Sequence, residues 1–274
     1  MDVYEEIIRL RREGRKGALA TIVNVRGSIP SFETAKMLVR ADGTIVGTIG
    51  GGCVEAEVWQ AAKEVMTSEK PRTLRFDLNN DPKYDTGLVC GGTLEVFVEP
   101  VAPAPHLYIF GAGHVAQSLY KVARIAGFDV TVADDRDIYA NRERFPEARD
   151  VYADDFDRIT TQLAPGENSY MVIATRGHRD DMRVLRWAIE QRVRYLGMIG
   201  SKRKVIAIYK ELEREDVSRE KLLQVAAPVG LAIGAITPEE IAVAIVAEMI
   251  AVRRHATPSF PRMRYFEEPA ELAP

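Results

Sequence analysis

Two cysteines beside glycines are the side chains of this sequence with the clearest potential for chemistry. Cys53 follows three glycines and precedes an expected helix, and Cys90 is followed by two glycines. A helix start favours the nucleophilic thiolate, and glycines let a ligand approach the backbone. A small buried thiol without reactivity is the competing interpretation of each. The glycines that we expect to contribute to ligand binding here are Gly50, Gly51, Gly52 and Gly91.

A second candidate site is a phosphate-binding turn. An apolar strand over residues 107–110 leads into the pattern Gly-x-Gly-x-x-Ala, in which Gly111 permits a tight turn and Gly113 lets a phosphate approach the backbone. The helix that follows offers its N-terminal amides to a pyrophosphate. Asp134 comes 23 residues after Gly111, close to the ~20-residue spacing of an acid that binds ribose. The pattern predicts a nucleotide-bearing ligand; a Rossmann-like domain without a nucleotide is the alternative.

Polar loops after two later strands are expected at the same edge of the sheet. Ser201 and Lys202 open a helix, where they can bind an anion or serve as an ordinary N-cap with a solvated basic face. His114 and His178 can point into the same crevice, although structural histidines are common. The sequence contains no Cys and His set with metal-site spacing.

The elements that must position these residues fall into two parts. After residue 105, strands and helices alternate, which predicts a parallel sheet covered on both faces. The expected strands are 107–110, 130–133, 151–152, 170–174, 195–199 and 223–226, and the expected helices are 115–126, 181–191 and 202–213. A closing helix has Thr237 as N-cap, Pro238 at the first position and Glu240 completing a capping box.

The first part reads as a small α+β domain. Helices are expected at 3–13 and 54–67, and strands at 18–25, 36–39, 44–48, 74–77 and 93–98, with an Asp-Gly hairpin turn at 42–43. Three prolines between residues 100 and 105 indicate a linker. The predicted fold class is therefore α/β, with a C-terminal Rossmann-like, doubly wound parallel sheet preceded by this α+β domain. Its expected boundaries are 1–100, a linker at 101–105, the Rossmann-like domain at 106–255 and a tail at 256–274.

Composition restricts the class of protein further. The 274 residues are 46% apolar with a net charge of −3, so a packed core is expected and a nucleic-acid partner is not. The acidic start lacks the pattern of a signal peptide. The most apolar stretch, 241–252, is interrupted by Glu248 and is too short for a membrane span. Two cysteines fit a reducing compartment, and the expectation is a cytoplasmic protein.

These segments together resemble the XdhC/CoxI family of accessory proteins for molybdenum-containing hydroxylases, over nearly the whole chain. Four segments carry the resemblance in the first domain: 27–30, 36–39, 47–55 and 89–92. Five carry it in the second: 111–116, 176–178, 197–204, 228–234 and 237–242. The Gly-Gly-Gly-Cys form is closer to the CoxI branch. One departure is that residues 31–35 lack the Arg and Gly that the family commonly has there.

The resemblance implies a chaperone rather than a catalyst. Its ligand would be the molybdenum cofactor, as molybdopterin or its cytosine dinucleotide, with Cys90 and Cys53 in thiol roles and Cys90 near the molybdenum. Implied partners are a cysteine desulfurase, an apo molybdenum hydroxylase and a second copy in a homodimer. From the residues alone, an NAD(P)-dependent oxidoreductase or an NAD-sensing module remains the alternative, because the glycine turn and Asp134 suit NAD equally well.

Overall fold

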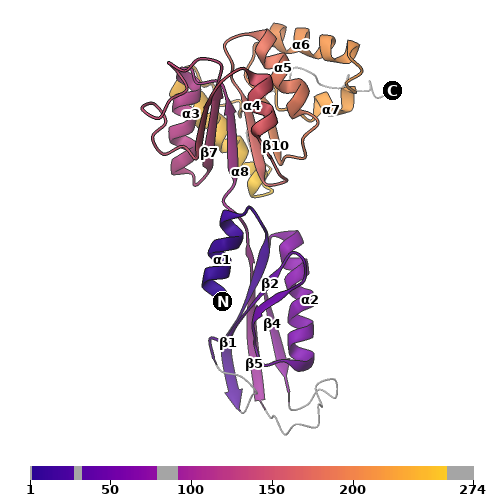
Figure 1. Cartoon of the computed structure of the whole chain (residues 1–274). Coiled ribbons are helices and arrows are strands. Elements are labelled where there is room, and N and C mark those ends of the chain that lie inside the picture. Colours follow the sequence, from indigo (N-terminus) through magenta and orange to yellow (C-terminus); the bar gives the residue numbers. More distant parts are fainter. Residues whose placement is uncertain (1, 28–32, 79–91, 258–274) are drawn as a thin grey trace, which may run out of the picture. The chain divides into compact units, whose positions relative to one another are not determined.

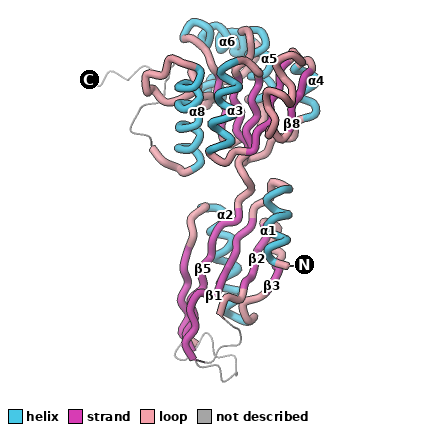
Figure 2. Tube along the Cα trace, turned by 90° about the vertical axis from the view of Figure 1, so that its left-hand side faces the viewer, coloured by secondary structure: helices cyan, strands magenta, loops and turns pink. Residues whose placement is uncertain are grey.

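The computed structural model describes residues 2–27, 33–78 and 92–257. Contacts divide the chain into two compact units, Met1–Ala104 and Pro105–Pro274. Each unit contains one five-stranded sheet (Figures 1 and 2). Among the described residues, no helix has the length and apolar character needed to cross a membrane.

The first unit is an antiparallel sheet with one helix on each face (Figure 1). The strands have the order β3-β2-β1-β5-β4. Its elements are α1 (Val3–Arg12), β1 (Gly17–Gly27), β2 (Lys36–Arg40), β3 (Ile45–Gly47), α2 (Gly52–Ser68), β4 (Arg72–Asp77) and β5 (Gly92–Val101). Alternation along β1 sends Ala18, Ala20 and Ile22 into the core beneath α2, whereas Leu19 packs with Leu10 of α1.

The second unit is a parallel sheet with helices on both faces, as predicted. Its strands are β6 (His106–Phe110), β7 (Asp129–Asp134), β8 (Asp150–Ala153), β9 (Ser169–Ile173) and β10 (Tyr195–Met198). Its helices are α3 (His114–Ile125), α4 (Phe156–Gln162), α5 (His178–Ala188), α6 (Lys202–Arg214), α7 (Arg219–Leu223) and α8 (Pro238–Arg253). The strand order is β10-β9-β6-β7-β8, with every pair parallel.

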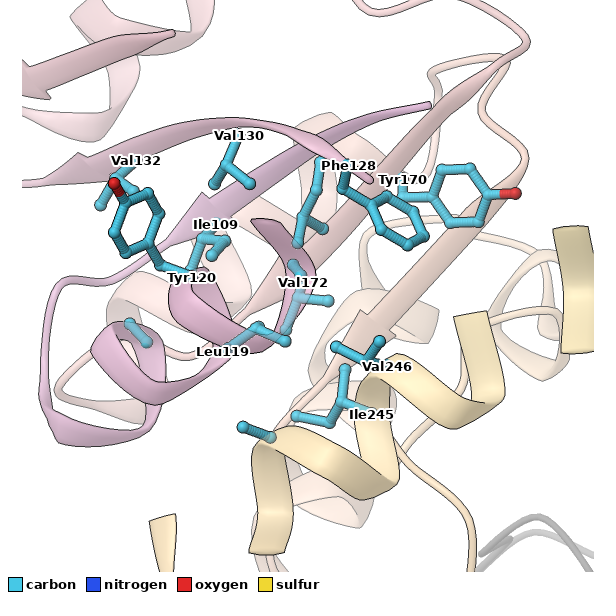
Figure 3. Close-up of a cluster of buried hydrophobic side chains, with 14 of the residues drawn as sticks. Ile109, Leu119, Tyr120, Phe128, Val130, Val132, Tyr170, Val172, Ile245 and Val246 are labelled. Atoms are coloured by element: carbon cyan, nitrogen blue, oxygen red, sulfur yellow. The ribbon is translucent and has the colours of Figure 1, made fainter. Parts of the chain in front are cut away.

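Two apolar clusters hold this second sheet between its helices. One face packs on α3 and α8 through residues such as Ile109, Leu119 and Ile245 (Figure 3). The other face packs on α4, α5 and α6 through residues such as Phe110 and Val184. Strands buried on both faces explain the continuous apolar runs in the sequence of this unit.

Two local predictions are wrong. The apolar run 223–226 is not a strand: α7 occupies Arg219–Leu223, and the segment then meets β10 through a single bridge between Gly197 and Ala226. The expected linker at 101–105 begins inside β5, because Val101 still pairs with Gly17 of β1. Pro100 is tolerated there because β4 pairs with β5 only as far as Val98, so no ladder hydrogen bond is lost on that side.

Candidate functional site

The glycine-rich turn after β6 is held tightly between its two neighbouring strands. Gly111 has φ +114° and donates its N–H to the carbonyl oxygen of Ala133 over 2.6 Å. A Cβ at Gly111 would lie 2.2 Å from the carbonyl oxygen of Ala174, so only glycine fits. Gly113 is the N-cap of α3 and has no side chain to bond the first helical amides. Those amides are therefore suited to an anionic ligand.

Asp134, the acid predicted to bind ribose, lies at the end of β7 and is buried. Its Oδ2 accepts the Ala112 N–H over 2.7 Å and Arg136 Nη2 over 2.9 Å. Its Oδ1 accepts Arg136 Nε over 2.7 Å and the Arg136 N–H over 3.1 Å. Burial alone would raise the pKa of Asp134, but the Arg136 guanidinium and the Ala112 amide hold it below its usual value. Asp134 thus fastens the glycine-rich turn to Arg136.

The neighbouring acid, Asp135, is more accessible. Its carboxylate forms an ion pair with Arg176 of the loop after β9, at 3.2 Å. Burial, followed by the hydrogen bond and charge of Asp134, raises the pKa of Asp135. Arg176 itself is exposed. A charged pair therefore connects the loops on either side of the glycine-rich turn.

A second ion pair fixes the loops after β9 and β10. Asp181, in the first turn of α5, is fully buried; its Oδ1 accepts the Thr175 hydroxyl over 2.6 Å and the Thr175 N–H over 3.1 Å. Its Oδ2 is paired with Lys204 of α6, whose Nζ also donates to the Ile199 carbonyl oxygen over 3.3 Å. Burial raises the pKa of Asp181, even with Lys204 and Thr175 acting in the opposite direction.

The remaining predicted residues of this unit lie at the same edge of the sheet. Ser201 caps α6 by accepting the Lys204 N–H, and Lys202 is the first residue of that helix and is exposed. His114 and His178 are the first residues of α3 and α5, and both are exposed. Because the chain reverses its strand order between β6 and β9, this edge is the position at which α/β sheets of this type bind ligands.

A buried acid of α8, Glu248, holds the loop that precedes this helix against the second sheet. Residues 226–229 run beside β10, and Gly230 follows with φ +104°, packed against the backbone of α8 at Ala244. Glu248 Oε2 accepts the Gly230 N–H over 2.8 Å and the Tyr195 hydroxyl over 2.6 Å. Glu248 therefore fixes where the segment leading to α8 leaves the sheet.

In the first unit, the glycine backbone of the loop before α2 is accessible to a ligand, and the Cys53 thiol lies next to it. Gly50, Gly51 and Gly52 all have positive φ, and a Cβ at Gly51 or Gly52 would meet nothing within 4 Å. Glu55 holds the loop: its Oε2 accepts the Thr48 hydroxyl over 2.7 Å and the Gly51 N–H over 3.2 Å. Cys53, in the first turn of α2, is exposed with a free thiol.

Cys90 and Gly91 lie outside the described residues. Within the described ranges, no group of three His, Cys, Asp or Glu side chains is arranged to hold a metal ion. A pocket among the described residues lies at the amino end of β10, beside Ile189, Arg194 and Lys221. None of the predicted site residues lines that pocket, and the chemistry expected from the sequence belongs to the opposite edge of the sheet.

Sequence reasoning missed four polar residues that shape these two sites, namely Glu55, Asp135, Arg136 and Arg176. Asp135 and Arg136 directly follow Asp134, the acid that the spacing predicts, so only the side-chain contacts distinguish the three residues. Arg176 belongs to one of the segments that resemble the family, but its residue type and spacing assign it no role. Glu55 lies three residues into α2, and no spacing rule relates it to the amides of the preceding glycines.

Comparison with known proteins identifies the family. A model of the XdhC and CoxI family matches residues 10–77, and a model of the XdhC Rossmann domain matches residues 107–249. The chain belongs to the XdhC and CoxI family. The two matched segments of this XdhC/CoxI protein lie one in each compact unit. The family and fold class predicted from the sequence are thereby confirmed.

Similar proteins extend over nearly the whole of this XdhC/CoxI chain. The uncharacterized protein YqeB of Escherichia coli K12 is 36% identical over 93% of the chain, which spans only 47% of YqeB. The molybdenum cofactor insertion chaperone PaoD of the same organism is 25% identical over 93% of the chain and 90% of PaoD. A crystal structure described as a xanthine dehydrogenase from Bacillus halodurans is 25% identical, with a TM-score of 0.52, and the match covers 94% of this chain and 97% of that one.

Proposed function

We propose that this protein is a molybdenum-cofactor chaperone that holds the cofactor, assists its sulfuration and passes it to an apo molybdenum hydroxylase of the xanthine dehydrogenase or CO dehydrogenase type. The observation that carries the proposal is the family match in both units, together with the likeness to the cofactor insertion chaperone PaoD along 93% of the chain. In this proposal a cysteine desulfurase donates the sulfur, and the chaperone works as a homodimer in the cytoplasm.

The first unit has groups that suit such a ligand. The cofactor is a pterin with a phosphate group and a dithiolene-bound molybdenum, and when bound it would carry the oxo ligand that the sulfur from the desulfurase replaces. The open backbone at Gly51 and Gly52 permits close approach of a bulky ligand, and the Cys53 thiol is exposed beside it. Cys53 would contact or shield the ligand, and Glu55 would keep the glycine amides in place. Cys90, from the second glycine cluster, is proposed as the thiol nearest the metal.

The second unit fits a phosphate or nucleotide. Gly111 and Gly113 bring backbone amides to the switch point of a parallel sheet, which is suited to a pyrophosphate. Ser201, Lys202, His114 and His178 lie at the same edge and are proposed as further ligand contacts. Both the cytosine dinucleotide form of the cofactor and NAD(P) present a pyrophosphate. The NAD(P)-dependent alternative is therefore tested in the same experiment.

The decisive test is an anaerobic titration of the purified full chain with mature molybdenum cofactor and, separately, with NAD. We expect tight cofactor binding by the wild type, weakened at least tenfold in Cys90→Ala and in Cys53→Ala. Gln60→Ala, at an exposed position of α2, is the matched control and should bind as the wild type does. Binding of NAD with no retention of the cofactor would overturn the chaperone and favour the nicotinamide-dependent alternative.

A further inference from the structure

The carboxylate of Asp134 has no room for a ribose hydroxyl. A carboxylate offers about four acceptor positions, and Asp134 already accepts four hydrogen bonds, two on each oxygen, from Ala112 and Arg136. Its side chain is 1% exposed. The Arg136 guanidinium is itself stacked over the Tyr139 ring, 4.2 Å from the ring centroid. Asp134 is therefore a positioning residue that shapes the turn.

Asp135 lies beside this network, with its Oδ1 3.5 Å from Arg136 Nε, but its Oδ2 is directed across the switch point to Arg176. Asp135 follows β7 and Arg176 follows β9, and β6 lies between these two strands in the sheet. Ion pairing between their side chains, at 3.2 Å, thus bridges the two loops that flank the Gly111–Gly113 turn. The Asp135 side chain is 30% exposed and that of Arg176 60% exposed. Ion pairs with this exposure contribute little to folding stability, so a ligand can separate them at small cost.

We propose that Asp135 and Arg176, and not Asp134, recognise the nucleotide of this unit, with Asp135 accepting the ribose hydroxyls and Arg176 donating to the phosphates of a ribonucleoside diphosphate group. The inference rests on the proposed function, because it takes the Rossmann unit as the nucleotide-binding part of the chaperone. It specifies the class of ligand that this unit accepts: one carrying a ribose with free hydroxyls next to a pyrophosphate.

The chemistry of the two side chains suits these two roles. An ionised carboxylate is a pure acceptor and can take both hydroxyls of a ribose, as acids at this place in dinucleotide-binding folds do. A guanidinium forms charge-assisted, geometrically defined hydrogen bonds with phosphate oxygens. Burial and the neighbouring Asp134 raise the pKa of Asp135, and hydroxyl donors at its oxygens would act in the opposite direction by stabilising the charged form. Ligand binding would replace each half of the ion pair with a new partner.

The test measures ribose discrimination by calorimetry, with CDP and its 2′,3′-dideoxy analogue as probes and NAD⁺ as a second ribose diphosphate. The wild type should bind CDP roughly tenfold more tightly than the dideoxy analogue, as expected for hydrogen bonds to a charged acceptor. In Asp135→Asn this ratio should fall towards one. In Arg176→Gln both probes should weaken roughly tenfold, because a phosphate contact is lost, while the ratio remains. Tighter binding of CDP than of NAD⁺ would support the cofactor's cytosine dinucleotide as the source of the nucleotide, and the reverse would support NAD.

Matched controls come from the ion pair at the end of β8, two strands away from β6 in the sheet. Asp154 and Arg158 are 3.5 Å apart, and Asp154→Asn and Arg158→Gln should leave both affinities unchanged. Asp134→Asn should lower the melting temperature but keep the discrimination ratio. The proposal is overturned if Asp134→Asn abolishes the ratio while Asp135→Asn keeps it, or if the wild type binds neither CDP nor NAD⁺. If the protein retains molybdenum cofactor but binds no nucleotide, this inference is wrong and the proposed chaperone function stands. If it binds nucleotide but retains no cofactor, the proposed chaperone function is wrong and this inference stands.

Discussion

The hydroxyl of Tyr195 donates to Oε2 of Glu248 over 2.6 Å, which ties the first residue of β10 to the middle of α8. The same oxygen accepts the Gly230 N–H over 2.8 Å. One buried carboxylate therefore determines the position of a strand, a helix and the loop that leads to the carboxyl edge of the second sheet.

Replacing Glu248 should destabilise the second unit more than replacing its phenol partner. Glu248→Ala leaves two buried donors without their acceptor, at a cost of about 2–5 kcal/mol, whereas Tyr195→Phe removes one hydrogen bond, at about 1 kcal/mol. Urea unfolding in a Trp59→Phe background checks this, because Trp187 of α5 then reports on the second unit alone. Equal losses in the two variants would contradict the assigned role of Glu248.

The two glycines of the turn after β6 should separate folding from ligand binding. Gly111→Ala places a Cβ 2.2 Å from the Ala174 carbonyl oxygen at φ +114°, so we expect a loss of several kcal/mol in folding stability, on the order of 3 or more. Gly113→Ala has open space and a negative φ, and should lose far less folding stability, about 1 kcal/mol, because alanine is a poorer N-cap than glycine. Its methyl group lies where a phosphate would approach, so the affinity for CDP or NAD⁺ should fall. A Gly113→Ala protein with wild-type affinity would remove this turn from the nucleotide site.

His106 should make the second unit less stable in mild acid. Burial, and then the charge of Arg149, lowers the pKa of His106 to about 4, and its Nε2 lies 2.9 Å from the Thr131 hydroxyl. Because the unfolded chain titrates near 6.5, the unfolded state binds more protons between pH 6.5 and pH 4. The contribution of His106 is complete above pH 6.5 and declines as pH falls, by about 3 kcal/mol at pH 4.

The measurement is the free energy of unfolding of the wild type and of His106→Gln between pH 4 and pH 8. The difference between the two proteins should be largest at neutral pH and should shrink towards pH 4. Carboxylates that are paired in the folded state give a slope of the same sign, and both proteins share that slope. A pH-independent difference would show that His106 is protonated equally in the folded and unfolded states.

Features with a local physical cause were predictable from the sequence. The capping box of Thr237 and Glu240, the Asp42–Gly43 hairpin and the glycine turn after β6 all form as expected, because each depends on neighbours within a few residues. The short helices α4 and α7 were missed, since Asp155 and Ser218 cap too few apolar residues to show a helical period. The apolar run 223–226 was misread because α7 extends to Leu223 and only Ala226 then pairs with β10.

The candidate sites show where spacing alone is insufficient. Counting from Gly111 leads to two adjacent acids, and no spacing rule specifies which partners each of them takes. Only the structure shows that Asp134 is turned inwards to Ala112 and Arg136 while Asp135 is paired with Arg176. Likewise, the bond from the Gly51 N–H to Glu55 depends on three consecutive positive φ values that sequence patterns do not specify.

The loop before α2 offers the last prediction, on thiol accessibility. Cys53 is exposed in the first turn of the helix, so iodoacetamide should alkylate it in the native full chain without denaturant, with peptide mass mapping to separate its label from any at Cys90. Glu55→Ala removes the acceptor for the Thr48 hydroxyl and the Gly51 N–H, which frees the glycine loop. We expect this variant to lose at least tenfold in cofactor affinity while Cys53 remains as reactive as before, because the thiol does not depend on Glu55 for its exposure.

The matched control is Glu64→Ala, which replaces an exposed acid of α2 that is paired with Arg72. Protection of Cys53 by bound cofactor in the control, together with its absence in Glu55→Ala, would place the ligand against this loop; alkylation at the same rate with and without cofactor in every variant would remove Cys53 from the binding site.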